Sequence, residues 1–440
     1  MRFCDIFIAK YCNMSQQKVK ELIQPGHLNR TSHSIIEESR NDVLSLPETK
    51  PNTKVPLRSN RIGVGVIFFM HGLCFASWAA RIPTIQENLQ LSSSRLGAVL
   101  FALPVGFFLS LPLAGWLVGI LGSKRVVILS AILYSLSLVC IGISTTTVAL
   151  VFSLLAFGFF ANLLNISINT QAVIVERLYA KKLMASFHGL WSLAGFSGAA
   201  IGAWMIGNNI APFTHYLFIT ITFLIVNSFC AYYLVTKDDV EQEKRPLFAM
   251  PDRSLIGLGI IAFCSMMAEG AMFDWSGIYF INVIKVDAEL TGLGYSTFMI
   301  AMAAMRFLAD GISGRFGLIR ILQLSGTLTT AGLLLAVIVP NLIPALIGFF
   351  LIGMGVSSVV PMVYSAAGKS KTLSPGTALT AVSSLGFMGL LIGPPLIGFI
   401  AEATSLRISF LAITAMSIAV VVLASLIPRQ PMDTPLGKSE

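Results

Sequence analysis

The sequence predicts an all-α integral membrane protein with twelve transmembrane helices, arranged as two pseudo-symmetric six-helix bundles. Twelve apolar runs approach the roughly 20 residues that a helix needs to cross a bilayer; examples are residues 62–80, 126–143, 217–235 and 409–427. Charged residues make up 12% of the chain, against about a quarter in a soluble domain. The runs are continuously apolar rather than alternating, which favours helices over a membrane barrel.

The charged and polar segments divide the chain into five parts. Residues 15–61 are too polar to form a core of their own, and residues 237–253 contain a cluster of acidic and basic side chains. We therefore expect a disordered cytoplasmic tail at 1–60, a first bundle at 61–236, a cytoplasmic linker at 237–253, a second bundle at 254–428 and a cytoplasmic tail at 429–440.

The distribution of Lys and Arg predicts the topology. With an even number of spans, most of these residues fall on one side of the membrane, whereas the other side keeps Arg81, Arg95, Lys285 and Arg407. Basic residues favour the cytoplasmic side. We therefore expect a multi-pass protein of the inner membrane with both termini in the cytoplasm. The net charge of +9 then reflects topology, and nucleic acid is not an expected partner.

Several classes of function lack their sequence signals. The chain contains no Gly-x-Ser-x-Gly, no His-Glu-x-x-His and no Gly-x-x-x-x-Gly-Lys-Ser/Thr segment, so we expect neither an enzyme nor an ATP-driven pump. Its six cysteines show no paired spacing, and we expect no metal, disulfide or cofactor. A channel filter or charge ring is also missing.

The two halves of the chain resemble each other weakly. Span 1 contains Gly63-Val-Gly65 and ends near Trp78, and span 7 contains Gly257-Leu-Gly259 and ends near Trp275. Span 4 has Phe157-Gly-Phe-Phe160 where span 10 has Ile347-Gly-Phe-Phe350, and spans 5 and 11 are both rich in glycine. Repeats of six spans are typical of transporters that move two bundles about a central site.

Two loops resemble the signature of the major facilitator superfamily, G-x-x-x-D-R/K-x-G-R/K-R/K. Residues 115–125 end in Gly122-Ser-Lys124-Arg125 but lack the acidic residue, and the second copy is Arg306-Phe-Leu-Ala-Asp310-Gly-Ile-Ser-Gly314-Arg315-Phe-Gly317. Further segments are similar to the YbjJ branch, which is related to fucose permeases and a rhizopine permease: Ser77-Trp-Ala-Ala-Arg81-Ile-Pro83, Ile168-Asn-Thr-Gln171, His188-Gly-Leu-Trp-Ser192, Ala268-Glu-Gly270, Asp274-Trp275 and Gly393-Pro-Pro395. The resemblance covers about residues 61–427 and implies transport of a small polar, sugar-like solute.

Two carboxyl groups in span 7 are the candidates for proton coupling. Ionisable groups at the centre of a membrane helix cost several kcal/mol, and they therefore mark functional sites. Glu269 lies midway along the span, and a hydrogen bond that holds the helix to its neighbours is the alternative role. Asp274 lies five residues further on, and packing with Trp275 at the helix end is an equal alternative.

Spans 1, 4 and 7 carry the polar side chains that we expect to bind the solute. His71 and Glu269 lie at similar depths of their repeated spans. Asn162, Asn165 and Asn169 follow at i, i+3 and i+7 along one face of span 4. The predicted binding residues are His71, Asn165, Asn169, Gln171 and Trp275; interhelical packing is the alternative for the histidine and the amides.

Basic and acidic residues near the ends of spans 2, 3 and 8 predict a gate. Arg306 and Asp310 are spaced i, i+4 and can pair within one helix. Together with the basic residues of both signature loops they form the predicted gating set, Lys124, Arg125, Arg306, Asp310 and Arg315.

The sequence therefore predicts a secondary transporter that moves a small polar solute by alternating access. We expect the lipid bilayer, the solute and protons as its partners, and we expect a monomer. The alternatives are a receptor or sensor that uses a transporter scaffold without transporting, and an efflux antiporter of the same superfamily. A Gly-Pro pair, typical of span 5 in drug antiporters, is missing from that span.

Overall fold

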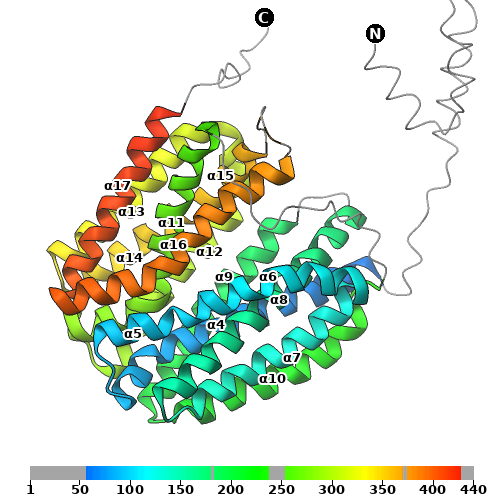
Figure 1. The fold of residues 1–440 in the computed structure, drawn as a ribbon, viewed down its shortest axis with the longest axis horizontal. Helices are drawn as coiled ribbons and strands as arrows, with labels where there is room; N and C mark the ends of the chain where they lie inside the picture. Colours follow the sequence, from blue (N-terminus) through cyan, green and yellow to red (C-terminus); the bar gives the residue numbers. More distant parts are fainter. Residues whose placement is uncertain are drawn as a thin grey trace, which may run out of the picture. The chain divides into compact units, whose positions relative to one another are not determined.

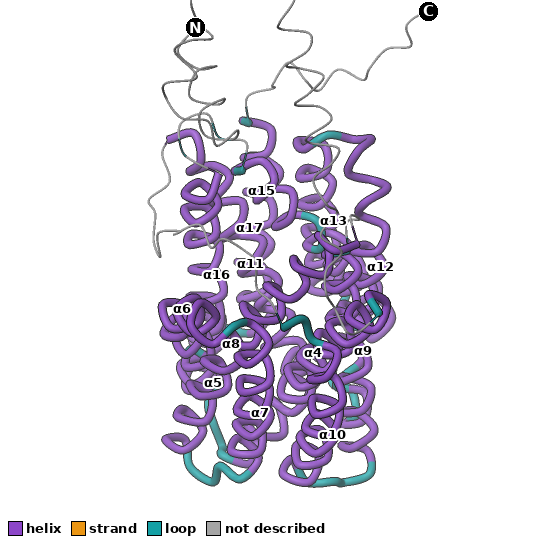
Figure 2. Tube along the Cα trace, turned by 90° about the vertical axis from the view of Figure 1, so that its right-hand side faces the viewer, coloured by secondary structure: helices purple, strands orange, loops and turns teal. Residues whose placement is uncertain are grey.

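The structure is a computed structural model of the 440-residue chain. It describes residues 56–179, 183–236, 253–368 and 375–427, together with Ser370 and Leu373; the side chains of 253–254, 309–316 and 375–376 are outside the description. The predicted C-terminal tail, nearly all of the predicted linker and residues 1–55 of the predicted N-terminal tail also lie outside it, whereas residues 57–60 of that tail belong to the first helix. The described residues fall within one compact unit. Helices account for almost all of the described residues (Figure 2).

The helices follow the predicted runs in order. Their bounds are α4 Leu57–Asn88, α5 Ser93–Leu100, α6 Ala102–Leu121, α7 Ser123–Gly142, α8 Thr147–Tyr179, α9 Met184–Gly207, α10 Pro212–Tyr233, α11 Arg253–Tyr279, α12 Leu293–Phe316, α13 Leu318–Ile338, α14 Leu342–Val356, α15 Val359–Ala367, α16 Pro375–Ala403 and α17 Leu406–Leu426. A π-helical turn, Phe280–Ile284, continues α11, and a 3₁₀ turn, Ala288–Leu290, precedes α12.

Eleven segments of the described chain are long and apolar enough to cross a membrane. The pairs α5–α6 and α14–α15 each count as one segment, because each is a single span with a break. Helix α12 has 24 residues and occupies the place of the predicted eighth span. It is not among the eleven segments, because fewer than 18 of its residues are described with their side chains. The all-helical membrane fold is therefore confirmed.

Proline explains both breaks. Pro104 lies three residues after the boundary at Phe101, and Pro361 lies three residues after Ser358. A proline ring clashes with the carbonyl group four residues earlier and removes one backbone donor. The helix therefore ends within one turn before each proline and starts again around it.

The contacts between helices form two groups, α4–α10 and α11–α17 (Figure 1). Between the groups, α9 packs against α12, α5 against α16, and α4 against α11. Helices α4 and α11 are the most enclosed spans, with 78% and 72% of their central windows buried, whereas no other candidate span exceeds 50%. Polar side chains on α4 and α11 thus lie at the centre of the protein.

Backbone geometry repeats between the two halves. Gln90 follows α4 with φ 48°, and Lys285 follows the α11 segment with φ 61°. Gly122 and Gly317 are the single residues that join α6 to α7 and α12 to α13, with φ 81° and 73°. With ψ at 148° and 162°, these two positions occupy a region open essentially to glycine alone. This explains the glycine at the end of each signature loop.

The glycines of spans 5 and 11 allow close helix packing. A Cβ on Gly198 would lie 2.6 Å from the Cβ of Ala76 in α4, and one on Gly389 would overlap the carbonyl oxygen of Phe263 in α11. The same two helices also approach the opposite group, because Gly195 abuts Met299 of α12 and Gly398 abuts Gly97 of α5. Small residues at these positions let backbones come together within and between the groups.

The repeat is not followed everywhere. Gly158 packs against the carbonyl oxygen of Leu103 at the start of α6, whereas Gly348, its match in sequence, packs against Gly332 of α13. In the second half it is Gly353 that packs against the equivalent of α6, at Phe298 of α12. The similarity of these two short segments therefore does not extend to their contacts.

Candidate functional site

An ion pair between α11 and α12 lies at the centre of the protein. Arg306 Nη2 is 3.4 Å from Glu269 Oε1, and this is the one ion pair found among the described side chains. The same guanidinium donates from Nη1 to Ser192 Oγ of α9, at 2.7 Å. Arg306 therefore joins a carboxylate of its own helix group to a hydroxyl group of the other. The side chains of Arg306 and Glu269 keep 18% and 14% of their surface exposed, so water can contact the pair.

This arrangement changes the role predicted for Arg306. The sequence analysis paired it with Asp310 in a gate, because four residues separate them on one helix. The structure directs the guanidinium to Glu269 and Ser192 instead. The side chains of Asp310 and Arg315, also assigned to the gate, lie outside the described residues.

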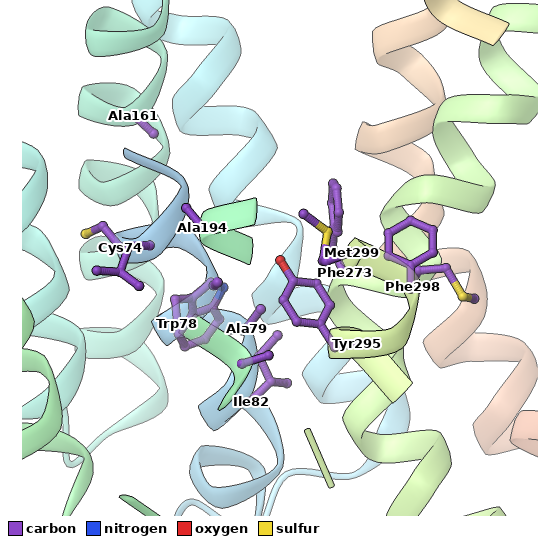
Figure 3. Close-up of a cluster of buried hydrophobic side chains, with 14 of the residues drawn as sticks. Cys74, Trp78, Ala79, Ile82, Ala161, Ala194, Phe273, Tyr295, Phe298 and Met299 are labelled. Carbon is purple, nitrogen blue, oxygen red and sulfur yellow. The ribbon is translucent and has the colours of Figure 1, made fainter. Parts of the chain in front are cut away.

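Aromatic rings from both helix groups pack together near this pair, and Figure 3 labels three of them, Phe273, Tyr295 and Phe298. Phe273, one turn after Glu269 on α11, has its ring centroid 5.4 Å from Phe75 of α4 and 6.0 Å from Trp191 of α9. Its ring is also 6.1 Å from Tyr295 of α12. Helices α4, α9, α11 and α12 thus meet through ring contacts at the interface of the groups.

His71 lies at the first-group end of these rings. Its ring centroid is 6.5 Å from that of Trp191 and 5.3 Å from that of Tyr134. Tyr134 Oη donates to the backbone carbonyl of His71 at 3.4 Å. Nδ1 of the imidazole is buried and has no hydrogen-bond partner within the described residues. The predicted histidine therefore lies beside the centre with an unused polar atom.

Tyr295 was not singled out by the sequence. Its side chain is 3% exposed, and its hydroxyl has no hydrogen-bond partner in the described part of the chain. Figure 3 shows this hydroxyl pointing away from α12 toward the helices of the first group.

Asp274 is partly buried and differs from Glu269 in having no partner. No hydrogen bond or ion pair to its carboxylate occurs among the described residues. The five-residue spacing turns Asp274 about 140° around α11 from Glu269. Gly270 and Gly277, which flank Asp274 at one turn on either side, face Leu390 of α16 and Pro83 of α4.

Gln171 has a structural role rather than the predicted one. Its amide nitrogen donates to Ser123 Oγ at 2.7 Å and to the Val235 carbonyl at 2.9 Å, and its oxygen accepts from the Val235 N–H at 2.8 Å. The side chain is fully buried. These bonds tie α8 to the start of α7 and to the end of α10, and they leave little of the amide for a solute.

The asparagines of the stripe on α8 differ in their contacts. Asn162 is buried and donates to Ser110 Oγ and to the Phe107 carbonyl of α6, at 2.7 and 3.1 Å. It therefore joins two helices. Asn169 donates to the backbone and side-chain oxygens of Asn165, at 2.7 and 3.0 Å, and both residues are half-buried.

Trp275, a predicted binding residue, is fully buried, as is Trp78 at the corresponding place in the first half. The indole N–H groups of both residues lack a hydrogen-bond partner within the described residues. A solute cannot reach a side chain with no exposed surface. Both tryptophans therefore pack the interior in this conformation.

The basic residues of the first half have contacts within their own group. Lys124 Nζ donates to the Leu234 carbonyl at 3.3 Å, and Arg125 is exposed. Arg81 is 2% exposed and donates to His215 Nδ1 and to the Ile210 carbonyl, at 3.3 and 2.6 Å. A closed gate in this conformation would require contacts between the two helix groups. None of the contacts of Lys124 and Arg81 described above reaches the other group.

Comparison with known proteins identifies the family. A family model described as Major Facilitator Superfamily matches residues 64–374 and 258–440. The chain belongs to this superfamily. Membrane protein MosC of Rhizobium meliloti is 31% identical over 400 residues, which cover 89% of this chain and 96% of that protein. An uncharacterized MFS-type transporter of Yersinia pestis is 30% identical over 372 residues, 84% of this chain and 96% of its own.

Solved structures support the same fold. The nucleoside transporter NupG has a TM-score of 0.67 at 13% identity and matches 84% of this chain and 100% of its own. A D-xylose–proton symporter has a TM-score of 0.67 at 12% identity, with 85% and 97% covered. This superfamily member is thus a multi-pass membrane protein and a secondary transporter of small solutes rather than an enzyme.

Three residues of the site were not predicted, because their residue types carry no signal in the sequence. Ser192, Trp191 and Tyr295 are neutral and of types that are common in membrane helices. Ser192 and Trp191 did fall within the quoted segment His188-Gly-Leu-Trp-Ser192, but only the contact with Arg306 shows which of its residues face the other group.

No group of three metal-ligating side chains occurs among the described residues.

Proposed function

We propose that this superfamily member couples movement of a small polar solute to protons through the Glu269–Arg306 pair. The observation that carries the proposal is the position of Arg306, which contacts a carboxylate of its own helix group and Ser192 of the other. A charge on Glu269 thus acts directly on a contact that crosses between the two groups.

The chemistry of the pair gives a mechanism. With Glu269 ionised, its attraction for Arg306 offsets part of the cost of keeping both charges away from bulk water. When Glu269 takes up a proton, the ion pair is lost and Arg306 is left to Ser192 or to a solute oxygen. A proton shifts a conformational equilibrium only as far as it favours one state over the other, and this change of partners supplies such a difference.

We assign solute binding to polar side chains of α4 and α8 that keep unused hydrogen-bonding atoms. His71 offers an unbonded Nδ1, and Asn165 and Asn169 retain accessible amide groups on α8. Amide and imidazole groups suit the hydroxyl groups of a sugar-like compound. We do not assign solute binding to Gln171, because its amide is hydrogen-bonded inside the fold. We do not assign it to Trp275, because this side chain has no exposed surface.

We also propose a membrane location, a topology, an oligomeric state and a branch of the superfamily for this protein. We place it in the inner membrane as a monomer with both termini in the cytoplasm, on the distribution of Lys and Arg. We also assign it to the narrower YbjJ and rhizopine-permease branch, on the short segments between Ser77 and Pro395 that resemble that branch. The D-xylose–proton symporter is an example of this fold working with protons and a sugar.

Flux measurements in proteoliposomes test the function. Purified protein is reconstituted with a trapped pH-sensitive dye, and sugars, polyols, nucleosides and amino sugars are added under an imposed pH gradient. We expect saturable uptake of at least one solute, accompanied by acidification of the lumen. Binding without flux would support a sensor, whereas solute movement opposite to proton movement would support an antiporter; either result contradicts proton symport.

A further inference from the structure

A small cavity lies inside the second helix group, and the site described above does not use it. Residues of α11, α13, α17 and the α14–α15 span line it, among them Ser265, Thr329 and Ser417. Its volume is about 10 Å³, close to the roughly 10–15 Å³ that a single water molecule requires. The cavity can therefore hold one water molecule but no larger solute.

The hydroxyl groups of these three residues complement one another. Ser265 is 4% exposed, and its hydroxyl has no hydrogen-bond partner among the described residues. Thr329 Oγ1 donates to the Ser325 carbonyl at 2.9 Å. Ser417 Oγ donates to the Ile413 carbonyl at 3.1 Å. The hydroxyl groups of Thr329 and Ser417 have thus used their protons and can still accept, whereas Ser265 has a proton to donate. A molecule that accepts one hydrogen bond and donates two would satisfy all three groups.

The first helix group has a tyrosine at the corresponding position. Tyr134 and Thr329 each lie twelve positions after the glycine of their loop that has positive φ, Gly122 or Gly317. Tyr134 is fully buried, and its hydroxyl crosses from α7 to the backbone carbonyl of His71 in α4. The threonine side chain is much shorter, and its hydroxyl bonds within α13. A water molecule in the cavity would make the connection from α13 to α11 that the tyrosine hydroxyl makes in the first half.

We infer that the cavity binds one ordered water molecule, which joins α11 to α13 and α17. The water accepts from Ser265 Oγ and donates to Thr329 Oγ1 and Ser417 Oγ, and about three hydrogen bonds are typical of a buried water. A metal cation fits less well, because none of the described lining residues is acidic and hard cations prefer carboxylate oxygens. The inference is independent of the proposed transport function, because it concerns the bonding inside one helix group.

The variant Ser265→Ala tests the inference through the sign of its effect. If water is bound, alanine removes one of its partners, and the midpoint of thermal unfolding of the full-length protein should fall by roughly 1–3 °C. If the cavity is dry, the same change removes a buried hydroxyl group that has no partner, and the midpoint should rise. We expect the fall.

Ser167→Ala is the matched control for this variant. Ser167 is also buried in a membrane helix, but its hydroxyl bonds to carbonyl groups of its own helix. The control therefore corrects for the higher helix propensity of alanine. A midpoint of Ser265→Ala that equals or exceeds that of the control would contradict the inference.

Two measurements on the wild-type protein distinguish water from other occupants and do not depend on the folding of a variant. A high-resolution map should show one peak within about 2.7–3.0 Å of the three hydroxyl oxygens, and replacing sodium in the buffer by choline should leave the unfolding midpoint unchanged. A midpoint that falls without sodium would indicate a bound cation. A map that resolves buried water elsewhere but has no peak here would indicate a dry cavity. Either result would overturn the inference.

Discussion

Helices α4 and α11 hold corresponding places in the two halves of the chain, but their polar groups are used differently. In α4, Arg81 is bonded to His215 and to the Ile210 carbonyl inside its own group. In α11, Glu269 contacts Arg306, which reaches Ser192 of the other group, and Asp274 has no partner among the described residues. The repeat thus preserves the scaffold, whereas charges able to change partners are concentrated in the second half.

The largest effect is expected at Arg306. Arg306→Met removes the partner of a buried carboxylate, a loss that typically costs about 3–5 kcal/mol, and it also removes the contact with Ser192. We expect gradient-driven uptake in proteoliposomes to be lost. The matched control is Arg95→Met, an exposed first-half residue outside every assigned site, which should keep its uptake. Normal uptake by Arg306→Met would show that the second half does not hold the coupling charges.

Gln171 tests whether the inner polar groups of the first half are structural. Gln171→Met removes three hydrogen bonds of about 1 kcal/mol each, so we expect stability to fall by about 3 kcal/mol. The solute preference of the folded fraction should not change. The measurement is thermal unfolding together with ligand-induced stabilisation. A change of preference with little loss of stability would restore Gln171 as a binding residue.

The paired glycines test how far the scaffold repeats. Gly122→Ala and Gly317→Ala each force an alanine into a backbone region that costs about 1–3 kcal/mol, and we expect similar losses of thermal stability from both. Gly115→Ala serves as the control, because it lies in a helix and a Cβ there meets nothing within 4 Å. Different losses at the two loops would weaken the equivalence of the halves.

Much of the fold follows from the sequence, because a bilayer demands long apolar helices and the chain shows them as uninterrupted runs. Both breaks come from proline, and the glycine of each signature loop reflects its backbone angles. The contacts of Gly158 and Gly348 were less predictable, since similar tripeptides pack against different helices. Packing partners depend on the whole surface of a helix rather than on three residues.

The site could be predicted in part. Glu269 and His71 stood out because polar groups inside a membrane helix are costly. The partner of Arg306 could not be predicted in this way. Spacing along one helix suggests Asp310, whereas the observed contact joins Arg306 to Glu269, 37 positions away in the chain. Gln171 is the converse case: a polar residue in a central span was interpreted as a binding group, but Ser123 and Val235 take up most of the hydrogen-bonding capacity of its amide.

The central claim is that the charge on Glu269 couples protons to solute movement, and the variant Glu269→Gln tests it most directly. The glutamine keeps the shape of the side chain but can no longer take up or release a proton. Concentrative uptake under a pH gradient is measured beside exchange of labelled for unlabelled solute at equal pH. We predict that uptake falls at least about tenfold while exchange continues. Undiminished gradient-driven uptake by Glu269→Gln would contradict the account.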